Sequence, residues 1–242
     1  MQFNWEREPI HDSAISALVT VPPGASALER IVGPLAQALE KRNRGFEILV
    51  IDETCKPLDM DKLRPIARLR VVESDKPGHG AALRAGLREA VHPLVFTFPA
   101  TGEYDPADLV KLLENIDKAD VICGQRQGLG WATRWRAWLV PYALFGVNFK
   151  DVRCPVRLYR RDIFKRIPIQ SASGFAEVEI LAKATFLERI FDEVPISWKP
   201  TGVTVDAGTV GDVWKVFNHP NFGPVHVEDA PPTGDASAAA AG

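Results

Sequence analysis

The feature that most constrains this chain is a regular alternation of short apolar runs with segments of helical character. The run at 15–21 (ISALVTV) is rich in β-branched residues, and a Pro22-Pro23-Gly24 turn follows it. A capping box, Ser26 to Glu29, predicts a helix from there to about Lys41. The order repeats with strands expected at 46–51, 69–72, 94–98 and 120–123, and helices at 81–91 and 106–116. This alternation predicts an α/β domain with a mostly parallel sheet, right-handed crossovers and flanking helices.

The second half of the chain is less regular. We expect an aromatic helix within 131–149, a strand at 156–159, a helix at 175–186 and a strand at 190–196. We divide the chain into an N-terminal extension (1–13), a single domain (14–228) and a tail (229–242). The composition of the tail (DAPPTGDASAAAAG) is typical of disorder.

Composition excludes several classes of protein. The formal charge of -2 gives no overall attraction to nucleic acid, so any anion site has to be local. The three cysteines form no cluster that indicates a disulfide framework or a zinc site. The charged and polar N-terminus does not resemble a secretion signal, and no apolar stretch approaches the ~20 residues of a membrane span. We therefore expect a cytoplasmic protein without a transmembrane segment.

Ligands of parallel α/β sheets bind beyond the carboxyl ends of the strands. Asp52, Lys76, the loop from Phe98 to Pro106 and Arg126 follow different strands and are therefore expected on one rim. Gly78 and Gly80 precede a helix, where their backbone N–H groups either cradle a phosphate or form a turn that needs positive φ. His79, between them, is interpreted as a solvated loop residue.

Taken in order, the rim segments resemble family 2 glycosyltransferases of the GT-A fold, especially the branch that transfers sugars to polyprenyl or dolichyl phosphates. The resemblance spans roughly Ala14 to Pro200. Its motifs are Val21-Pro22, Asp52-Glu53, the run from Lys76 to Gly86 (KPGHGAALRAG), 120–126 (DVICGQR), 151–161 (DVRCPVRLYRR) and 193–196 (EVPI).

The resemblance implies a UDP- or GDP-sugar donor and a polyprenyl-phosphate acceptor, reached from a position peripheral to the inner membrane surface. It assigns the donor to Pro22, Asp52, Glu53, Lys76, Gly78, Gly80, Arg84, Ala100 and Thr101. It assigns the acceptor to Arg126, Arg134, Arg153 and Arg157. It also suggests Glu177 as a base, although a phosphate acceptor needs none and charged helix-face residues are a common alternative.

One departure from the family pattern stands out. Where the family has an Asp-x-Asp metal motif, this chain reads Pro99-Ala100-Thr101. Hard cations prefer charged oxygen ligands, so Mg²⁺ or Mn²⁺ binding should be weakened. Glu103 and Asp105 are candidates for a shifted metal site, but Asp105 before Pro106 also reads as a helix N-cap, which we favour.

Several alternatives remain open at this point. Alternation predicts that Arg153, Arg157 and Arg161 share one face, either for a phosphate or simply in solvent. Trp131, Trp135 and Trp138 share a helical side, which by default is a core stripe and otherwise an interfacial helix. The whole protein is a transferase, a catalytically inactive relative that binds a nucleotide, lipid phosphate or protein, or, less in keeping with the 22–26 turn, a nucleotidyltransferase.

Overall fold

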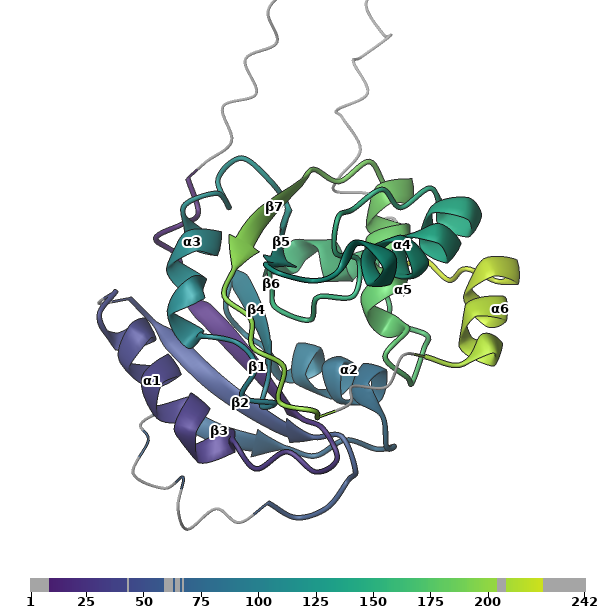
Figure 1. Cartoon of the computed structure of the whole chain (residues 1–242). Coiled ribbons are helices and arrows are strands. Elements are labelled where there is room, and N and C mark those ends of the chain that lie inside the picture. The colour runs from purple at the N-terminus through teal and green to yellow at the C-terminus, as the bar shows by residue number, and fades with distance from the viewer. Residues whose placement is uncertain are drawn as a thin grey trace, which may run out of the picture.

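A computed structural model describes residues 9–42, 44–58, 63, 66, 68–203 and 208–223, apart from the side chains of residues 134, 136 and 140. The predicted tail, 229–242, and most of the predicted extension, 1–13, lie outside the described residues. The described part contains one seven-stranded sheet with helices on both faces (Figure 1).

The sheet has the order β3-β2-β1-β4-β6-β5-β7. Its strands are β1 (Ile15–Val21), β2 (Phe46–Asp52), β3 (Leu69–Val72), β4 (Leu94–Pro99), β5 (Val121–Arg126), β6 (Arg157–Arg160) and β7 (Phe191–Ile196). Only β6 runs against its neighbours among these strands, because it pairs antiparallel with both β4 and β5. The prediction of a mostly parallel sheet is confirmed.

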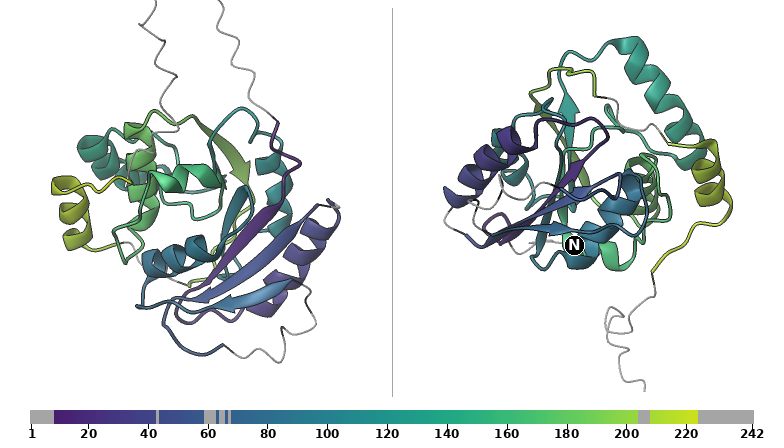
Figure 2. Two further views of the ribbon diagram at one scale, coloured as in Figure 1. Left: turned by 180° about the vertical axis from the view of Figure 1, so that it is seen from behind. Right: turned by 90° about the horizontal axis from the view of Figure 1, so that it is seen from below.

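Helices pack on both faces of the sheet (Figure 2). They are α1 (Leu28–Glu40), α2 (His79–Glu89), α3 (Leu109–Leu113), α4 (Trp131–Phe145), α5 (Ala176–Phe186) and α6 (Val210–Asn218), with 3-10 turns η1 (Pro106–Asp108) and η2 (Arg161–Lys165). The sequence did not predict α6. The capping box was also wrong: α1 begins at Leu28 with Ala27 as N-cap and no side-chain cap, because the Pro22–Ala25 turn carries the chain past Ser26.

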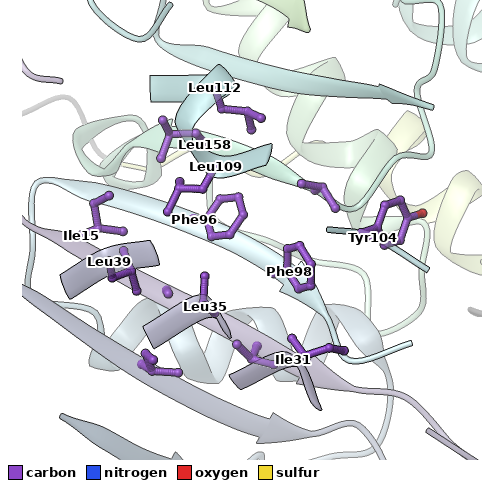
Figure 3. Close-up of a cluster of buried hydrophobic side chains, with 14 of the residues drawn as sticks. Ile15, Ile31, Leu35, Leu39, Phe96, Phe98, Tyr104, Leu109, Leu112 and Leu158 are labelled. Atoms are coloured by element: carbon purple, nitrogen blue, oxygen red, sulfur yellow. The ribbon is translucent and has the colours of Figure 1, made fainter. Parts of the chain in front are cut away.

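Two apolar layers hold the helices on the sheet. Alternate residues of the central strands point to opposite faces, so Phe96 and Phe98 pack with α1 and α3 (Figure 3). Val95 and Leu18 pack on the other face with α2 and α5. Because β4 is buried along its whole length, the loop that follows it starts from a fixed position.

Candidate functional site

The carboxyl ends of β1, β2 and β4 meet on one rim of the sheet. Val21 pairs with Asp52, and Thr20 pairs with Pro99. Backbone hydrogen bonds join the following loops: Glu53 N–H donates to the Val21 carbonyl at 3.0 Å, and Ala100 N–H donates to the Thr20 carbonyl at 2.7 Å. Residues distant in sequence are thus held together at this rim.

The loop after β4 is covered by the segment that follows β7. Ala100 and Thr101 are buried. The Thr201 hydroxyl donates to the Thr101 carbonyl at 3.0 Å, and a β-bridge joins Tyr104 to Trp198. The segment around Thr201 therefore forms one wall of the rim.

The acidic residues of this loop make backbone contacts. Asp105 accepts a hydrogen bond from Ala107 N–H at 2.9 Å, which confirms it as the N-cap of η1. Glu103 accepts from Thr201 N–H at 3.2 Å. Within the described part of the chain, no group of three or more His, Cys, Asp or Glu could hold a metal ion. Pro99 has no side-chain oxygen and Thr101 has only a neutral hydroxyl, so together with Glu103 and Asp105 these residues do not fit a divalent-cation site.

Asp52 lies at the end of β2 and is partly exposed. Its Oδ1 accepts hydrogen bonds from Thr54 N–H at 2.6 Å, from the Thr54 hydroxyl at 2.5 Å and from Lys56 N–H at 3.2 Å. The carboxylate therefore shapes its own loop. Its predicted contact with a nucleotide stays a prediction.

A buried charged cluster lies directly behind the rim. We define it as Glu53, His79, Glu177 and Arg157, all of which are at most 4% exposed. His79 Nδ1 lies 2.7 Å from Glu53 Oε1, and its Nε2 lies 2.8 Å from Glu177 Oε1. Arg157 Nη1 lies 2.8 Å from Glu177 Oε2. The interpretation of His79 as solvated was wrong, because its partners lie far away in sequence.

The charged cluster shifts the pKa values of His79 and Glu177. Burial disfavours an imidazolium, but the hydrogen bonds that the ring donates to Glu177 and Glu53, together with the charges of these carboxylates, prevail and raise the pKa of His79 from 6.5 to about 10. Burial alone would raise the pKa of Glu177, but the positive charge of Arg157 and the hydrogen bond with His79 lower this pKa overall. His79 is therefore a cation at neutral pH, held between the carboxyl groups of Glu53 and Glu177.

This cluster alters three of the predicted site roles. Glu53 faces His79 in the interior instead of a nucleotide on the rim. Glu177 is buried between Arg157 and His79, so its carboxylate does not face an acceptor. Arg157, predicted on a basic surface, is fully buried and donates to the carbonyls of Glu177 and Val152, both at 2.7 Å.

The predicted basic face of three arginines does not exist. The strand β6 begins only at Arg157, so the alternation does not reach Arg153, which lies in an exposed turn. Arg161 begins η2, and its Nη1 donates to the Ala90 carbonyl at 2.7 Å. An acceptor role for Arg153 stays a prediction.

The two glycines before α2 are required by close packing rather than by a phosphate. Gly78 has φ +113°, and a Cβ there would lie 2.3 Å from the Ala172 carbonyl oxygen. A Cβ on Gly80 would lie 2.3 Å from the Ser171 carbonyl oxygen. The Gly78 N–H donates to the Glu53 carbonyl and the Gly80 N–H donates to the Ala172 carbonyl. Contrary to the phosphate-cradle interpretation, both donors are already used.

Two cations predicted for the donor differ in their surroundings. Arg84 donates to the carbonyls of Ile169 at 3.2 Å and Ser171 at 2.6 Å, so it fastens α2 to that segment instead of facing the rim. Lys76 is exposed after β3, on the rim side. Only Lys76 has the exposure that a phosphate ligand requires.

Arg126, at the end of β5, is held in a two-pronged contact with Asp151. Nε and Nη2 donate to the two carboxylate oxygens, both at 2.8 Å. Burial opposes the charge, but the hydrogen bonds and charge of Asp151 raise the pKa of Arg126 above its ordinary value. Its guanidinium also lies over the Trp198 ring, 5.6 Å from the centroid. The side chain of Arg134, also predicted for the acceptor, lies outside the described residues.

The tryptophans of α4 are not a core stripe. Trp131 is 81% exposed and Trp135 is 54% exposed, which contradicts the default interpretation. Trp138 is half-buried and stacks on Tyr142 with centroids 4.4 Å apart. Periodicity gave the shared side correctly, but it carries no information about whether protein covers that side.

Sequence reasoning missed three residues of the rim. Asp151 orients Arg126, Trp198 lies beneath it, and Lys199 is exposed beside them, with its N–H donating to the Glu103 carbonyl at 2.9 Å. The sequence did contain a signal for Trp198 and Lys199. They follow β7, whose carboxyl end points to the same rim as that of β5.

Comparison with known proteins agrees with this geometry. The chain matches glycosyl transferase family 2 over residues 27–176. An uncharacterized glycosyltransferase of Mycobacterium tuberculosis (strain ATCC 25618 / H37Rv) is 26% identical over 193 residues, which cover 72% of this chain and 87% of the relative. A dolichyl-phosphate hexose transferase of Haloferax volcanii is 29% identical over 184 residues, covering 71% of this chain and 78% of the relative.

A third relative and a solved structure extend the comparison. An undecaprenyl-phosphate mannosyltransferase of Micrococcus luteus is 29% identical over 139 residues, covering 51% of this chain and 57% of the relative. The glucosyl-3-phosphoglycerate synthase of Mycobacterium tuberculosis superposes with a TM-score of 0.62 at 16% identity, over 86% of this chain and 77% of that one. The fold is thus that of glycosyltransferases, and the family match spans more than half of the sequence. The chain belongs to glycosyl transferase family 2.

Proposed function

We propose that the protein transfers a sugar from a UDP- or GDP-sugar to the phosphate of a lipid-linked acceptor at a membrane surface. The observation that carries the proposal is a family 2 rim with three polar side chains at least partly exposed on it. Asp52 and Lys76 follow the neighbouring strands β2 and β3, and Lys199 lies in the segment after β7 that is hydrogen-bonded to the loop following β4. The names of the Micrococcus and Haloferax relatives supply the acceptor class.

The proposed reaction is a single displacement. An oxygen of the acceptor phosphate attacks the anomeric carbon, while the bond from that carbon to the donor's diphosphate oxygen breaks and the diphosphate leaves with the electron pair. The acceptor oxygen is already ionised, so the reaction needs no general base, which suits a Glu177 buried in the charged cluster.

Charge on the departing diphosphate has to be stabilised by the rim. Because the loop from Pro99 to Asp105 does not fit a metal, we assign this role to Lys76, Lys199 and Arg126. Of these, Arg126 is held in position by Asp151 before the reaction. We derive no step through a metal ion.

Calorimetric titration with UDP, GDP and their sugars, with and without Mn²⁺, tests the donor site. We expect binding that does not depend on the metal. Transfer to a short polyprenyl phosphate, measured with and without EDTA, tests the reaction. Turnover that strictly requires Mg²⁺ would contradict the metal-independent reaction.

A catalytically inactive relative that binds a nucleotide, a lipid phosphate or a protein is the second candidate. It is favoured by the loss of carboxylates at Pro99 and Thr101. The double substitution P99D/T101D, with its unfolding measured alongside, tests whether a metal site was lost at these two positions, and a gain in Mn²⁺ affinity would indicate such a loss. Donor binding without any transfer by the wild type would favour a nucleotide-binding module, and absence of any donor binding would favour a module that binds a protein partner.

A further inference from the structure

Two helices carry most of the exposed large apolar side chains of the second half of the chain. Both lie at the outer edge of the molecule (Figures 1 and 2), and they meet at the end of α4, where the ring centroids of Phe145 and Phe217 are 5.9 Å apart. We call their exposed apolar side chains the aromatic face, which consists of Trp131, Trp135, Leu139, Tyr142 and Leu144 of α4 and Val210, Trp214 and Phe217 of α6.

Each helix presents these side chains at helical spacing. Val210, Trp214 and Phe217 follow i, i+4, i+7, while Val216 is buried against the domain. Val210 is 86% exposed and Trp214 is 67% exposed. A helix that is apolar on its outer side requires a cover, and the described residues provide none.

The charges near the aromatic face indicate which kind of partner covers it. No acidic residue occurs from Gln127 to Phe149, whereas Arg134 and Arg136 lie within α4 and Lys150 follows it. On α6, Lys215 is exposed, and Asp212 is turned inward onto the Ser173 hydroxyl. In a chain with a net charge of -2, the aromatic face is thus flanked by exposed Lys150 and Lys215, and its α4 part lies in a segment without acidic residues, which makes it complementary to an anionic phospholipid surface.

The type of side chain agrees with this choice. Tryptophan and tyrosine combine an apolar ring with a polar group, and they concentrate at the headgroup level of bilayers. A groove of about 640 Å³ lies under the tryptophans of α4, with Phe149, Lys150 and Glu193 in its walls. It offers apolar contact beside a cation. Among the described residues no helix is long and apolar enough to cross a membrane, so the contact would lie in the plane of the surface.

We propose that the aromatic face binds the protein to an anionic lipid bilayer. This inference rests on the proposed function only in supplying the route to a lipid-linked acceptor. The segment 127–130 connects Arg126 on the rim directly to Trp131, so the bound face adjoins the candidate site.

Co-sedimentation of the full chain with lipid vesicles, without donor or acceptor, tests the proposal. One set is phosphatidylcholine, and the other contains about one third phosphatidylglycerol. We expect strong binding to the anionic set only, with a blue shift of tryptophan emission and quenching by brominated lipids. W131A/W135A should weaken binding on the order of tenfold, and W214A should weaken it less.

Matched controls distinguish binding through the aromatic face from non-specific adsorption to vesicles. V91S/V110S removes exposed valines outside the aromatic face, and this variant should bind vesicles like the wild type. K150E/K215E should abolish the preference for anionic lipid, and the matched charge variant K41E should keep it. All of these positions are exposed, so folding should be retained.

Three results would overturn the inference: absence of binding to anionic vesicles, equal losses in the control and tryptophan variants, or a dimer in solution that dissociates in W131A/W135A without any vesicle binding. Donor titration is read independently. A protein that binds vesicles but no sugar nucleotide would refute the proposed transferase and leave this inference standing.

Discussion

His79 is held between two carboxylates from segments far apart in sequence. Because both Glu53 and Glu177 are buried with it, removing the imidazolium leaves an excess of negative charge in the interior. We expect H79Q to lower the free energy of unfolding by about 3–5 kcal/mol, as for other broken buried ion pairs. Urea denaturation near neutral pH measures this loss, and a loss below about 1 kcal/mol would contradict the charged cluster.

The same residue predicts a dependence of stability on pH. The pKa of His79 is 6.5 in the unfolded chain and about 10 in the fold, so the native state binds the proton more tightly. The stabilisation is complete below the unfolded pKa and is lost as pH rises through the folded pKa. Burial also raises the pKa of the Cys123 thiol, but from 9.0, so the fall that begins above 6.5 belongs to His79. Stability measured between pH 6.5 and 9.0 should decline in the wild type and decline much less in H79Q.

Among the elements, α2 depends on how closely another backbone approaches its first turn. In G80A the new Cβ would lie 2.3 Å from the Ser171 carbonyl oxygen and 2.9 Å from the Ala176 Cβ, so backbone must move. We expect a loss of about 1–3 kcal/mol. G33A within α1 is the matched control, because nothing lies within 4 Å of its Cβ, and it should gain about 0.5–1 kcal/mol. Thermal unfolding compares the two.

Substitutions of Asp105, the N-cap of η1, distinguish its role as a helix cap from its proposed role as a metal ligand. As an N-cap it should tolerate asparagine, whereas D105A should cost about 1 kcal/mol. As a metal ligand it would lose its charge in both variants. Unfolding together with Mn²⁺ titration resolves the roles: equal loss of Mn²⁺ affinity in D105N and D105A would support the shifted metal site.

Sequence patterns were most informative for elements whose partners are local. The strand at 15–21 and the buried run that became β4 were predicted to within a residue, because apolar and β-branched runs between turns indicate buried strands. The predictions that the α4 tryptophans are buried and that His79 is solvated were wrong for a different reason. The exposure of Trp131 and the partners of His79 depend on residues brought together only by the completed fold.

At the scale of the whole molecule, the rim is assembled from both halves of the chain. Lys199 comes from the segment after β7, yet its N–H binds the loop that follows β4. We expect K199A to weaken binding of the UDP- or GDP-sugar while leaving the melting temperature unchanged, because its side chain is exposed. K41A, just after the end of α1, is the control for lost charge. Equal donor affinities in K199A and the wild type would remove Lys199 from the proposed site.

The reversed strand β6 also determines when the sheet can be completed. It lies between β4 and β5, although both precede it in sequence. During synthesis, β1 to β4 can pair early, but the inner edges of β4 and β5 stay open until Arg160 has emerged. Open strand edges are sites of intermolecular pairing. A chain cut before residue 157 should therefore aggregate more readily than one cut after residue 196, in which β6 and β7 have both paired with β5.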